Sequence, residues 1–235
     1  MKTPILYVLC EGETEGLFVK QVLKPYLKDK GIIVKYHLLV NSQKKGTSGG
    51  IHSYQQVRRD LLLTVRQAKA GESEKIFFTT MIDFYALPGS FPRWQEIMAM
   101  EDRYKRVSEM EKAFAADVQI EDFIPYIQLH EFEALVFCGL EHLLIDYPNC
   151  QREVADLKKV LATYNDNPEL INTTPDGAPG KRLAKTIGKK YNYNKPKTGA
   201  LVADKVGIEA LRGKCRHFDE WLKLLEDEAA RILSE

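Results

Sequence analysis

Hydrophobic and polar positions follow two patterns in the first half of the chain. Short, nearly continuous runs of β-favouring hydrophobic residues predict buried strands, whereas longer stretches with hydrophobic residues every three or four positions predict helices. The predicted strands are 4–10, 32–40, 75–82 and 123–129, and the predicted helices are 15–30, 54–70 and 93–117. Alternating strands and helices of this kind predict a parallel sheet with helices on both faces.

The pattern changes from residue 131 onward, where helical spacing dominates. A stretch over 165–199 reads as loop-rich, and the last helix is predicted over 215–232, where the hydrophobic residues share one face. We therefore predict an α/β, Rossmann-like domain over 1–137, with about four parallel strands, and a mostly helical region over 138–235 that packs on it.

Composition narrows the class of protein without deciding its function. The chain has 235 residues, of which 44% are hydrophobic and 29% charged, with a formal net charge of +1. These values are ordinary for a soluble globular protein, and no hydrophobic run approaches the length that spans a membrane. The four cysteines form no CxxC pair, and the N-terminus lacks the pattern of a signal peptide. We therefore expect a cytoplasmic protein with no membrane partner, and any argument for nucleic-acid binding must be local.

The first candidate chemistry follows the first predicted strand, in the segment Glu11-Gly12-Glu13-Thr14-Glu15. Gly12 allows a sharp turn, and Thr14 is predicted to cap the helix that begins near Glu15. In an open α/β sheet, ligands bind outside the carboxyl ends of the strands, and carboxylates are the ligands that Mg²⁺ prefers. The alternative is an acidic first turn that only complements the helix dipole.

Two later strands also end in acidic residues. Asp83 follows the third predicted strand, where it faces Glu11 if the first and third strands are neighbours; the alternative is a turn-capping role. Glu131 and Glu133 lie at the end of the fourth strand: a strand would place both on one face, whereas a helix would separate them by about 200°. His130 precedes them and is a candidate base, metal ligand or simple hydrogen-bonding group. Three strand ends that each carry an acid suit a divalent-metal site for phosphoryl transfer.

A basic stretch supplies the opposite charge. Between Lys181 and Lys197 there are seven basic residues and no acidic one, with tyrosines interleaved. Such a stretch can neutralise phosphates and stack on unpaired bases, although a solvated surface loop is the alternative. The glycine spacing around Lys181 does not match a Walker A motif, so ATP hydrolysis by this chain alone is not expected. A glycine-rich loop over 41–50 adds two more lysines. The predicted nucleic-acid contacts from the loop and the basic stretch are Lys44, Lys45, Lys181, Arg182, Lys185, Lys189, Lys190 and Tyr191.

The acidic turn after the first strand resembles the first motif of Toprim domains, which occur in topoisomerases, primases and overcoming-lysogenization-defect (OLD) nucleases. The ordered set of motifs is more specific: it resembles a bacterial family of Toprim-like proteins of unknown function. That family includes the nuclease effector subunit of the PARIS anti-phage defence system, which works beside an ABC-type ATPase. The motifs that carry the likeness are Glu11-Gly12-Glu13-Thr14-Glu15, Asp83-Phe84-Tyr85-Ala86-Leu87-Pro88, His130-Glu131-Phe132-Glu133-Ala134-Leu135-Val136-Phe137 and Ala178-Pro179-Gly180-Lys181-Arg182.

The resemblance implies a nuclease that depends on Mg²⁺ or Mn²⁺. In Toprim enzymes, the glutamate matching Glu11 is a metal ligand or general acid/base, and OLD-type nucleases carry a second acid that matches Glu15. The Toprim pattern Asp-x-Asp is incomplete here, because Tyr85 stands where the second aspartate would be. The missing carboxylate would then come from Glu131 or Glu133, of which Glu133 is narrowly preferred.

We therefore expect a hydrolase that cleaves phosphodiester bonds in DNA or RNA, acting as an anti-phage defence effector. The expected catalytic residues are Glu11, Asp83, His130 and Lys181, and the expected metal ligands are Glu11, Glu15, Asp83, Glu131 and Glu133. The alternative is a non-catalytic or regulated module that docks on an ABC-type ATPase partner. A third hypothesis is a nucleotide-binding or nucleotidyl-transfer enzyme that uses the same acids. Homo-oligomer formation stays open.

Overall fold

The computed structural model describes residues 2–39, 51–171 and 177–235. Its centre is a five-stranded sheet in which every pairing is parallel, with the strand order β2-β1-β3-β4 and with β5 also paired to β3. This confirms the predicted α/β fold. The strands are β1 Thr3–Cys10, β2 Ile33–Leu38, β3 Glu74–Asp83, β4 Phe123–Ile124 and β5 Ile127–Gln128.

The fourth predicted strand is divided into β4 and β5 because Pro125 interrupts the ladder. Proline has no N–H to donate and is tolerated only at strand edges and irregularities. At the interruption, the hydroxyl of Thr80 on β3 lies 3.0 Å from both the N–H and the carbonyl oxygen of Tyr126. A side chain thus replaces the missing ladder contacts, and the chain stays parallel to β3 on both sides of the proline.

Helices surround the sheet, and several differ from the predicted boundaries. The α-helices are α1 Glu13–Phe18, α2 Lys24–Lys28, α3 Tyr54–Gln67, α4 Trp94–Met98, α5 Arg103–Val118, α6 Glu133–Phe137, α7 Leu143–Asp146, α8 Gln151–Ala162, α9 Pro179–Leu183, α10 Lys189–Tyr191, α11 Lys195–Val206, α12 Ile208–Lys214 and α13 Arg216–Leu233. The π-helical segments are η1 Val19–Leu23 and η6 Ala184–Gly188, and the short 3-10 turns are η3 Phe84–Ala86, η4 Leu140–His142 and η5 Pro168–Leu170.

Three of these helical predictions were wrong in detail. The helix expected over 93–117 is broken into α4 and α5, because Asp102 caps α5 by accepting a hydrogen bond from the Lys105 N–H at 3.0 Å. Thr14 is not a helix cap, since α1 already begins at Glu13. The stretch expected to be loop-rich contains α9, η6, α10 and the start of α11.

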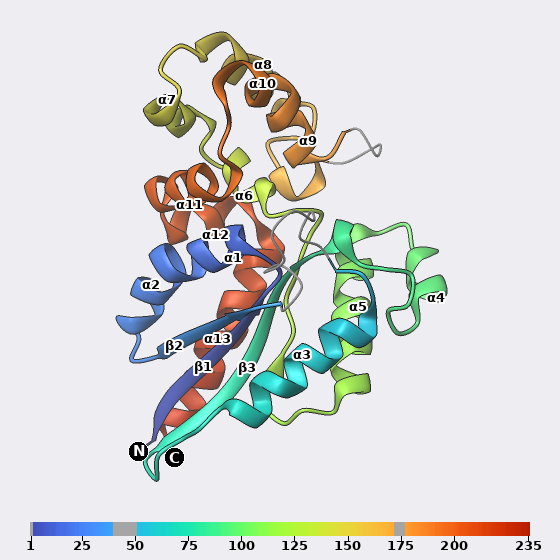
Figure 1. The fold of residues 1–235 in the computed structure, drawn as a ribbon, viewed down its shortest axis with the longest axis vertical. Helices are drawn as coiled ribbons and strands as arrows, with labels where there is room; N and C mark the ends of the chain where they lie inside the picture. The colour runs from blue at the N-terminus through green and yellow to red at the C-terminus, as the bar shows by residue number, and fades with distance from the viewer. Residues whose placement is uncertain (1, 40–50, 172–176) are drawn as a thin grey trace.

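Alternate residues of β1 point into hydrophobic cores on opposite faces of the sheet. Leu6 and Val8 belong to a large core that includes Trp221 of α13, whereas Leu9 belongs to a second core formed with α3 and α5. This is the period of two expected for a strand that is buried on both faces. Figure 1 shows the same layers, with α13 on one side of the sheet and α3 and α5 on the other.

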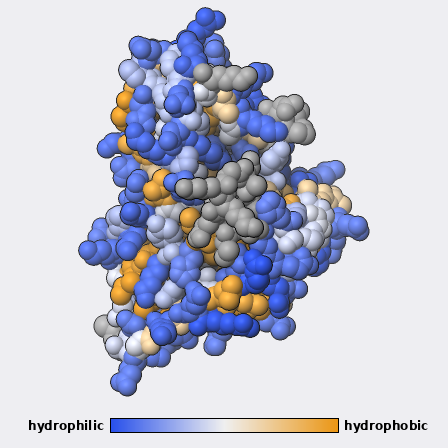
Figure 2. All heavy atoms as spheres, in the orientation of Figure 1, coloured by the Kyte–Doolittle hydropathy of each residue, from blue (hydrophilic) through white to orange (hydrophobic). Residues whose placement is uncertain are grey.

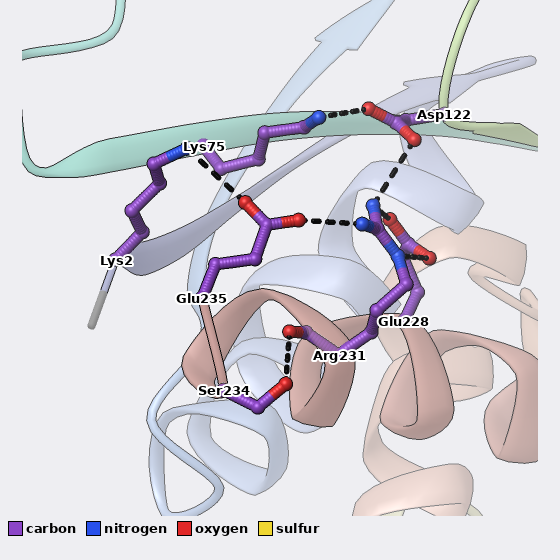
Figure 3. A network of polar contacts seen from close by, with 7 residues as sticks. All are labelled: Lys2, Lys75, Asp122, Glu228, Arg231, Ser234 and Glu235. Carbon is purple, nitrogen blue, oxygen red and sulfur yellow. Dashed lines mark hydrogen bonds and ion pairs between the residues drawn. The ribbon is translucent and has the colours of Figure 1, made fainter.

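The last helix, α13, is fastened to the sheet along its length. Trp221 stacks on Tyr126 with ring centroids 4.2 Å apart, and its indole N–H donates to the Thr79 hydroxyl at 2.9 Å. At the far end, Arg231 pairs with Asp122 at 3.2 Å in the network of Figure 3, which also joins the beginning and end of the described chain. The N-terminal and C-terminal halves therefore share one core.

The surface carries the remaining general features. The described part of the face in Figure 2 is mostly hydrophilic, with small hydrophobic areas scattered over it. None of the helices in residues 2–39, 51–171 and 177–235 combines the length and hydrophobicity that crossing a bilayer requires.

Candidate functional site

Glu11 and Asp83 meet at the carboxyl end of the sheet. β1 and β3 are neighbours, and their register continues past β1, since the Glu11 N–H donates to the Met81 carbonyl at 2.9 Å. The Asp83 N–H in turn donates to Oε2 of Glu11 at 2.9 Å. The chain leaves β1 toward β2 on one side and later returns to β3 on the other, so the two acids lie at the point where the strand order reverses.

The segment after β5 brings further acids to the same place. Oδ1 of Asp83 accepts a hydrogen bond from the Phe132 N–H at 2.9 Å, which ties this segment to the end of β3. Glu131 and Glu133 flank Phe132, but neither lies on a strand, because β5 ends at Gln128 and α6 begins at Glu133. Of the two local geometries left open for these glutamates, the strand is therefore excluded.

Glycine at position 180 allows α9 to approach both glutamates. Oε2 of Glu131 accepts a hydrogen bond from the Gly180 N–H at 2.7 Å. A Cβ atom on Gly180 would lie 2.9 Å from Glu131 Oε2 and 3.2 Å from Glu133 Cδ, closer than side chains normally pack. Both carboxylates therefore face the start of α9, although they come from different local structures.

Glu15, on α1, is the last member of a group of acids that we call the acidic cluster: Glu11, Glu15, Asp83, Glu131 and Glu133. Glu15 is buried, and its Oε2 accepts a hydrogen bond from the Gly12 N–H at 2.9 Å. A pocket of about 270 Å³ opens beside these acids. Figure 1 shows α1 and α11, which carry several of its lining residues, close together above the sheet. The pocket is lined by Glu11, Gly12, Glu13, Thr14, Glu15, Asp83, Lys195 and Pro196.

Burial changes the acid strength of the cluster. It is the largest cause that raises the pKa of Glu11 from 4.5 to about 7, and the charge of Glu15 adds to the effect. Burial, followed by the charge of Glu11, raises the pKa of Asp83 well above its ordinary value. Burial also raises the pKa values of Glu15 and Glu131. Carboxylates with such raised pKa values gain free energy from a nearby cation, because the cation favours their ionised form.

Lys195 supplies a positive charge inside the cluster. Its Nζ lies 2.9 Å from Oε1 of Glu133, whose side chain is 1% exposed, while the lysine side chain is 46% exposed. Burial lowers the pKa of Lys195, but the charges of Glu133 and Asp83 raise it more, so its pKa lies above the ordinary value. Sequence reasoning placed Lys195 in the basic stretch but not in the site.

The position of Lys195 depends on how α11 begins and packs. Asn194 caps the helix by accepting a hydrogen bond from the Lys197 N–H at 3.1 Å, and Pro196 occupies the first turn. Gly199, one turn later, lets α11 lie against Phe132, since a Cβ there would be 3.0 Å from the phenyl ring. The Asn-Lys-Pro segment signals a helix start in the sequence, but nothing local signals that this start meets α1.

The residues present fit a divalent cation in chemistry, although they are not arranged as a finished site. Oε2 of Glu133 is buried and accepts no hydrogen bond from any described residue, which leaves it available as a ligand. Carboxylate oxygens are the ligands that Mg²⁺ and Mn²⁺ take. Within the described ranges, however, no three acid, imidazole or thiol groups are already gathered around one point. A cation would have to draw the carboxylates together or share its ligands with water and substrate.

His130 lies beside the cluster but outside the pocket lining. It is buried at a positive φ of 70°, and its carbonyl accepts a hydrogen bond from the Tyr85 N–H at 2.9 Å. Burial, together with Arg103 and Arg106, lowers its pKa to about 4, so the imidazole is neutral at pH 7. Its Nε2 neither accepts nor donates a hydrogen bond within the described part of the chain.

The predicted nucleic-acid contacts divide into two groups. Lys181 lies on α9 with its Nζ 5.6 Å from the centre of the Tyr85 ring, next to the acidic cluster. Lys190 and Tyr191 instead contact Glu153 of α8, at 2.8 and 3.3 Å. Arg182 donates to the Gly177 carbonyl at 2.6 Å, and Lys185 lies on η6. Lys44, Lys45 and the side chain of Lys189 lie outside the described residues.

Comparison with known proteins gives a family but no function. The model of the family described as Domain of unknown function (DUF4276) matches residues 10–226. The chain belongs to this family. No curated protein and no solved structure matches it. The family match runs from before Glu11 to beyond Lys195, so the whole acidic cluster lies inside it.

Proposed function

We propose that this protein is a metal-dependent phosphodiesterase that acts on nucleic acid. The observation that carries the proposal is the convergence of buried acids: Glu11, Glu15 and Asp83 line one pocket with Lys195. Lys195 also pairs with Glu133, which comes from the segment after β5. Burying that many carboxylates is unfavourable unless cations compensate them. The resemblance of the acidic motifs to Toprim nucleases supports the same reading.

In this proposal, each acid has a stated task. Glu11 and Asp83 hold Mg²⁺ or Mn²⁺ at the ends of β1 and β3, and Glu15, Glu131 and Glu133 complete or support the ligand set. When bound, the cation supplies charge neutralisation for the phosphate and stabilises the leaving oxygen. The described part of the chain brings few positive groups to the pocket. A cation with open coordination positions would therefore supply the positive charge that a phosphodiester needs.

Two groups of the chain are suited to manage charge and protons. Lys195 neutralises Glu133 when the pocket holds no other cation, and its exposed side chain can turn to a phosphate oxygen of the substrate. The pKa of Glu11 is raised to about 7 in the metal-free pocket, so this carboxyl would release a proton near neutral pH when a cation binds to it.

The test combines metal binding with cleavage. Calorimetry with Mg²⁺ and Mn²⁺ is compared between wild type, Glu11→Gln and Asp83→Asn. Glu101→Gln is the control, because Glu101 is exposed and does not line the pocket. The same four proteins are incubated with single-stranded and duplex DNA and RNA. We expect metal binding and cleavage to be lost in both site variants and kept in the control. Full metal binding in both site variants would refute the assignment of Glu11 and Asp83 as metal ligands.

A second candidate is a non-catalytic or regulated module that docks on a partner, which the resemblance identifies as an ABC-type ATPase. The ion pair between Lys195 and Glu133 favours it, because the pocket is partly neutralised without any metal. Such a module would keep its affinity for the partner in Glu11→Gln and would cleave nothing alone. A cytoplasmic location suits either candidate, since all four cysteines are buried free thiols.

A further inference from the structure

Tyr85 exposes an aromatic ring at the edge of the acidic cluster. It lies in η3, two residues after Asp83, and its N–H donates to the carbonyl of His130, the residue before Glu131. The backbone of Tyr85 is therefore held between two of the acid-bearing segments. Its side chain is 46% exposed, and it is the one aromatic among the exposed large hydrophobic side chains of the described chain.

A lysine lies over the same ring. Nζ of Lys181 is 5.6 Å from the centre of the Tyr85 ring, within the range of a cation–π contact. The preceding residue, Gly180, donates its N–H to Glu131, so Lys181 is placed at the rim of the cluster by the same contact that holds an acid. An aromatic face and a positive charge therefore lie side by side next to the carboxylates.

The other tyrosines of the basic stretch do not offer such a face. The Tyr191 hydroxyl donates to the Asn149 carbonyl at 2.8 Å, and its ring packs with Tyr147. Tyr193 is only partly exposed and packs against the large core. Tyr85 is therefore better placed than these two tyrosines to stack on a base, because it is exposed and its backbone is anchored to the cluster.

We propose that Tyr85 stacks on an unpaired base of the substrate while Lys181 binds the neighbouring phosphate, so that the strand enters the site single-stranded. The inference rests on the proposed function and adds the substrate class to it. In a duplex, base faces are covered by the stacked bases above and below, whereas a single strand leaves them open to an aromatic side chain. Stacking of this kind tolerates any base, because every base has a flat face.

The experiment measures binding without cleavage, using Ca²⁺ in place of Mg²⁺. Dissociation constants are determined by fluorescence anisotropy for a labelled 12-nucleotide single-stranded DNA, the RNA of the same sequence, and a blunt DNA duplex. The proteins are wild type, Tyr85→Phe, Tyr85→Ala, and Leu224→Ala as the matched control, because Leu224 is another exposed large side chain but lies on α13. A 2-aminopurine base in the single strand reports stacking through its fluorescence.

We expect Tyr85→Ala to weaken single-strand binding by about 5- to 150-fold and to abolish the 2-aminopurine quenching. Tyr85→Phe should retain both, Leu224→Ala should match wild type, and duplex binding should be equally weak in all four proteins. Comparison of the single-stranded DNA with the RNA of the same sequence shows which of the two nucleic acids supplies the unpaired base. Equal single-strand affinity in wild type and Tyr85→Ala would overturn the inference, as would an equal loss on the duplex.

The outcome for the inference is separable from that for the proposed function. If wild type neither binds nor cleaves any nucleic acid, the proposed function and this inference both fail. If wild type cleaves and Tyr85→Ala cleaves single strands with unchanged KM, only the inference fails. Lys181→Gln provides a second measurement. If Lys181 binds a phosphate, its loss should make the affinity for the single strand less dependent on salt concentration. An unchanged salt dependence would contradict the role given to Lys181.

Discussion

The ion pair between Lys195 and Glu133 can be tested by removing the lysine charge. In Lys195→Met, the carboxylate of Glu133 stays buried, but its partner at 2.9 Å is lost. Removing one partner of a fully buried pair costs about 3–5 kcal/mol of unfolding free energy. The Lys195 side chain is 46% exposed, so water screens the interaction, and we expect a smaller loss of about 1–3 kcal/mol.

The assay is urea unfolding at pH 7.5 with EDTA, where no divalent cation compensates the pocket. The matched control is Lys197→Met, two residues along the same helix, because Lys197 is 71% exposed and lies 3.8 Å from Asp146. We expect the control to stay within about 0.5 kcal/mol of wild type. A cycle with Glu133→Gln should show a coupling free energy of about 1 kcal/mol or more. Equal unfolding free energies for the two lysine variants would refute the reasoning.

Repeating the unfolding with Mg²⁺ separates the ion pair from the metal proposal. A ligand that binds only the folded state at 100 times its Kd stabilises it by about 2.7 kcal/mol. If a divalent cation takes the place of the Lys195 ammonium, Lys195→Met should gain at least as much stability from Mg²⁺ as wild type does. If Mg²⁺ stabilises neither protein, the metal part of the proposed function is wrong, while the ion pair stands.

Three further variants test other parts of the structure. In EDTA across pH 4–8, wild type should lose up to about 3 kcal/mol of unfolding free energy as the pH rises from about 4.5 to 7, because the folded Glu11 keeps a proton that the unfolded chain releases. Glu11→Gln should not show this loss. Parallel pH profiles for the two proteins would contradict the prediction. Gly180→Ala should displace the Glu131 carboxylate and weaken metal binding in calorimetry, while its urea midpoint stays near that of wild type; unchanged affinity would remove Glu131 from the ligand set. Trp221→Phe keeps a ring on Tyr126 but loses the bond to Thr79, so urea unfolding should show a loss of about 1–3 kcal/mol, and no loss would mean that this bond does not anchor α13.

The sheet could be predicted from the sequence because its signals are local. β1 and β3 are buried on both faces, so they appear in the sequence as continuous hydrophobic runs. An acid placed directly after such a run must lie at the carboxyl end of the sheet, and neighbouring strands then bring Glu11 and Asp83 together. The helix break before Asp102 was missed, because the charged residues on either side suit a helix equally well.

The second half of the site could not be predicted, because its signals were ambiguous or distant. Pro179 and Pro196 were read as loop residues, yet each stands in the first turn of a helix, where a missing N–H costs nothing. Lys195 reaches the acids only because α11 packs on α1, a contact between segments about 180 residues apart in the chain. No periodicity within either segment specifies that pairing, so the lysine was assigned only to a basic stretch.

The way the acids are held bears on why the fold keeps them. Buried carboxylates are unfavourable, and hydrophobic residues of similar size would stabilise the same space as well or better. Yet four of these acids are each fixed by a backbone N–H, so their positions are set before any cation or substrate arrives. The donors, in chain order, are Gly12 to Glu15, Asp83 to Glu11, Phe132 to Asp83 and Gly180 to Glu131. These hydrogen bonds satisfy backbone N–H groups, and the same preorganisation lowers the cost of binding a cation in a defined geometry. The charge of the pocket is therefore better explained by use than by stability, and the packing of α13 on the sheet contributes stability that the pocket lacks.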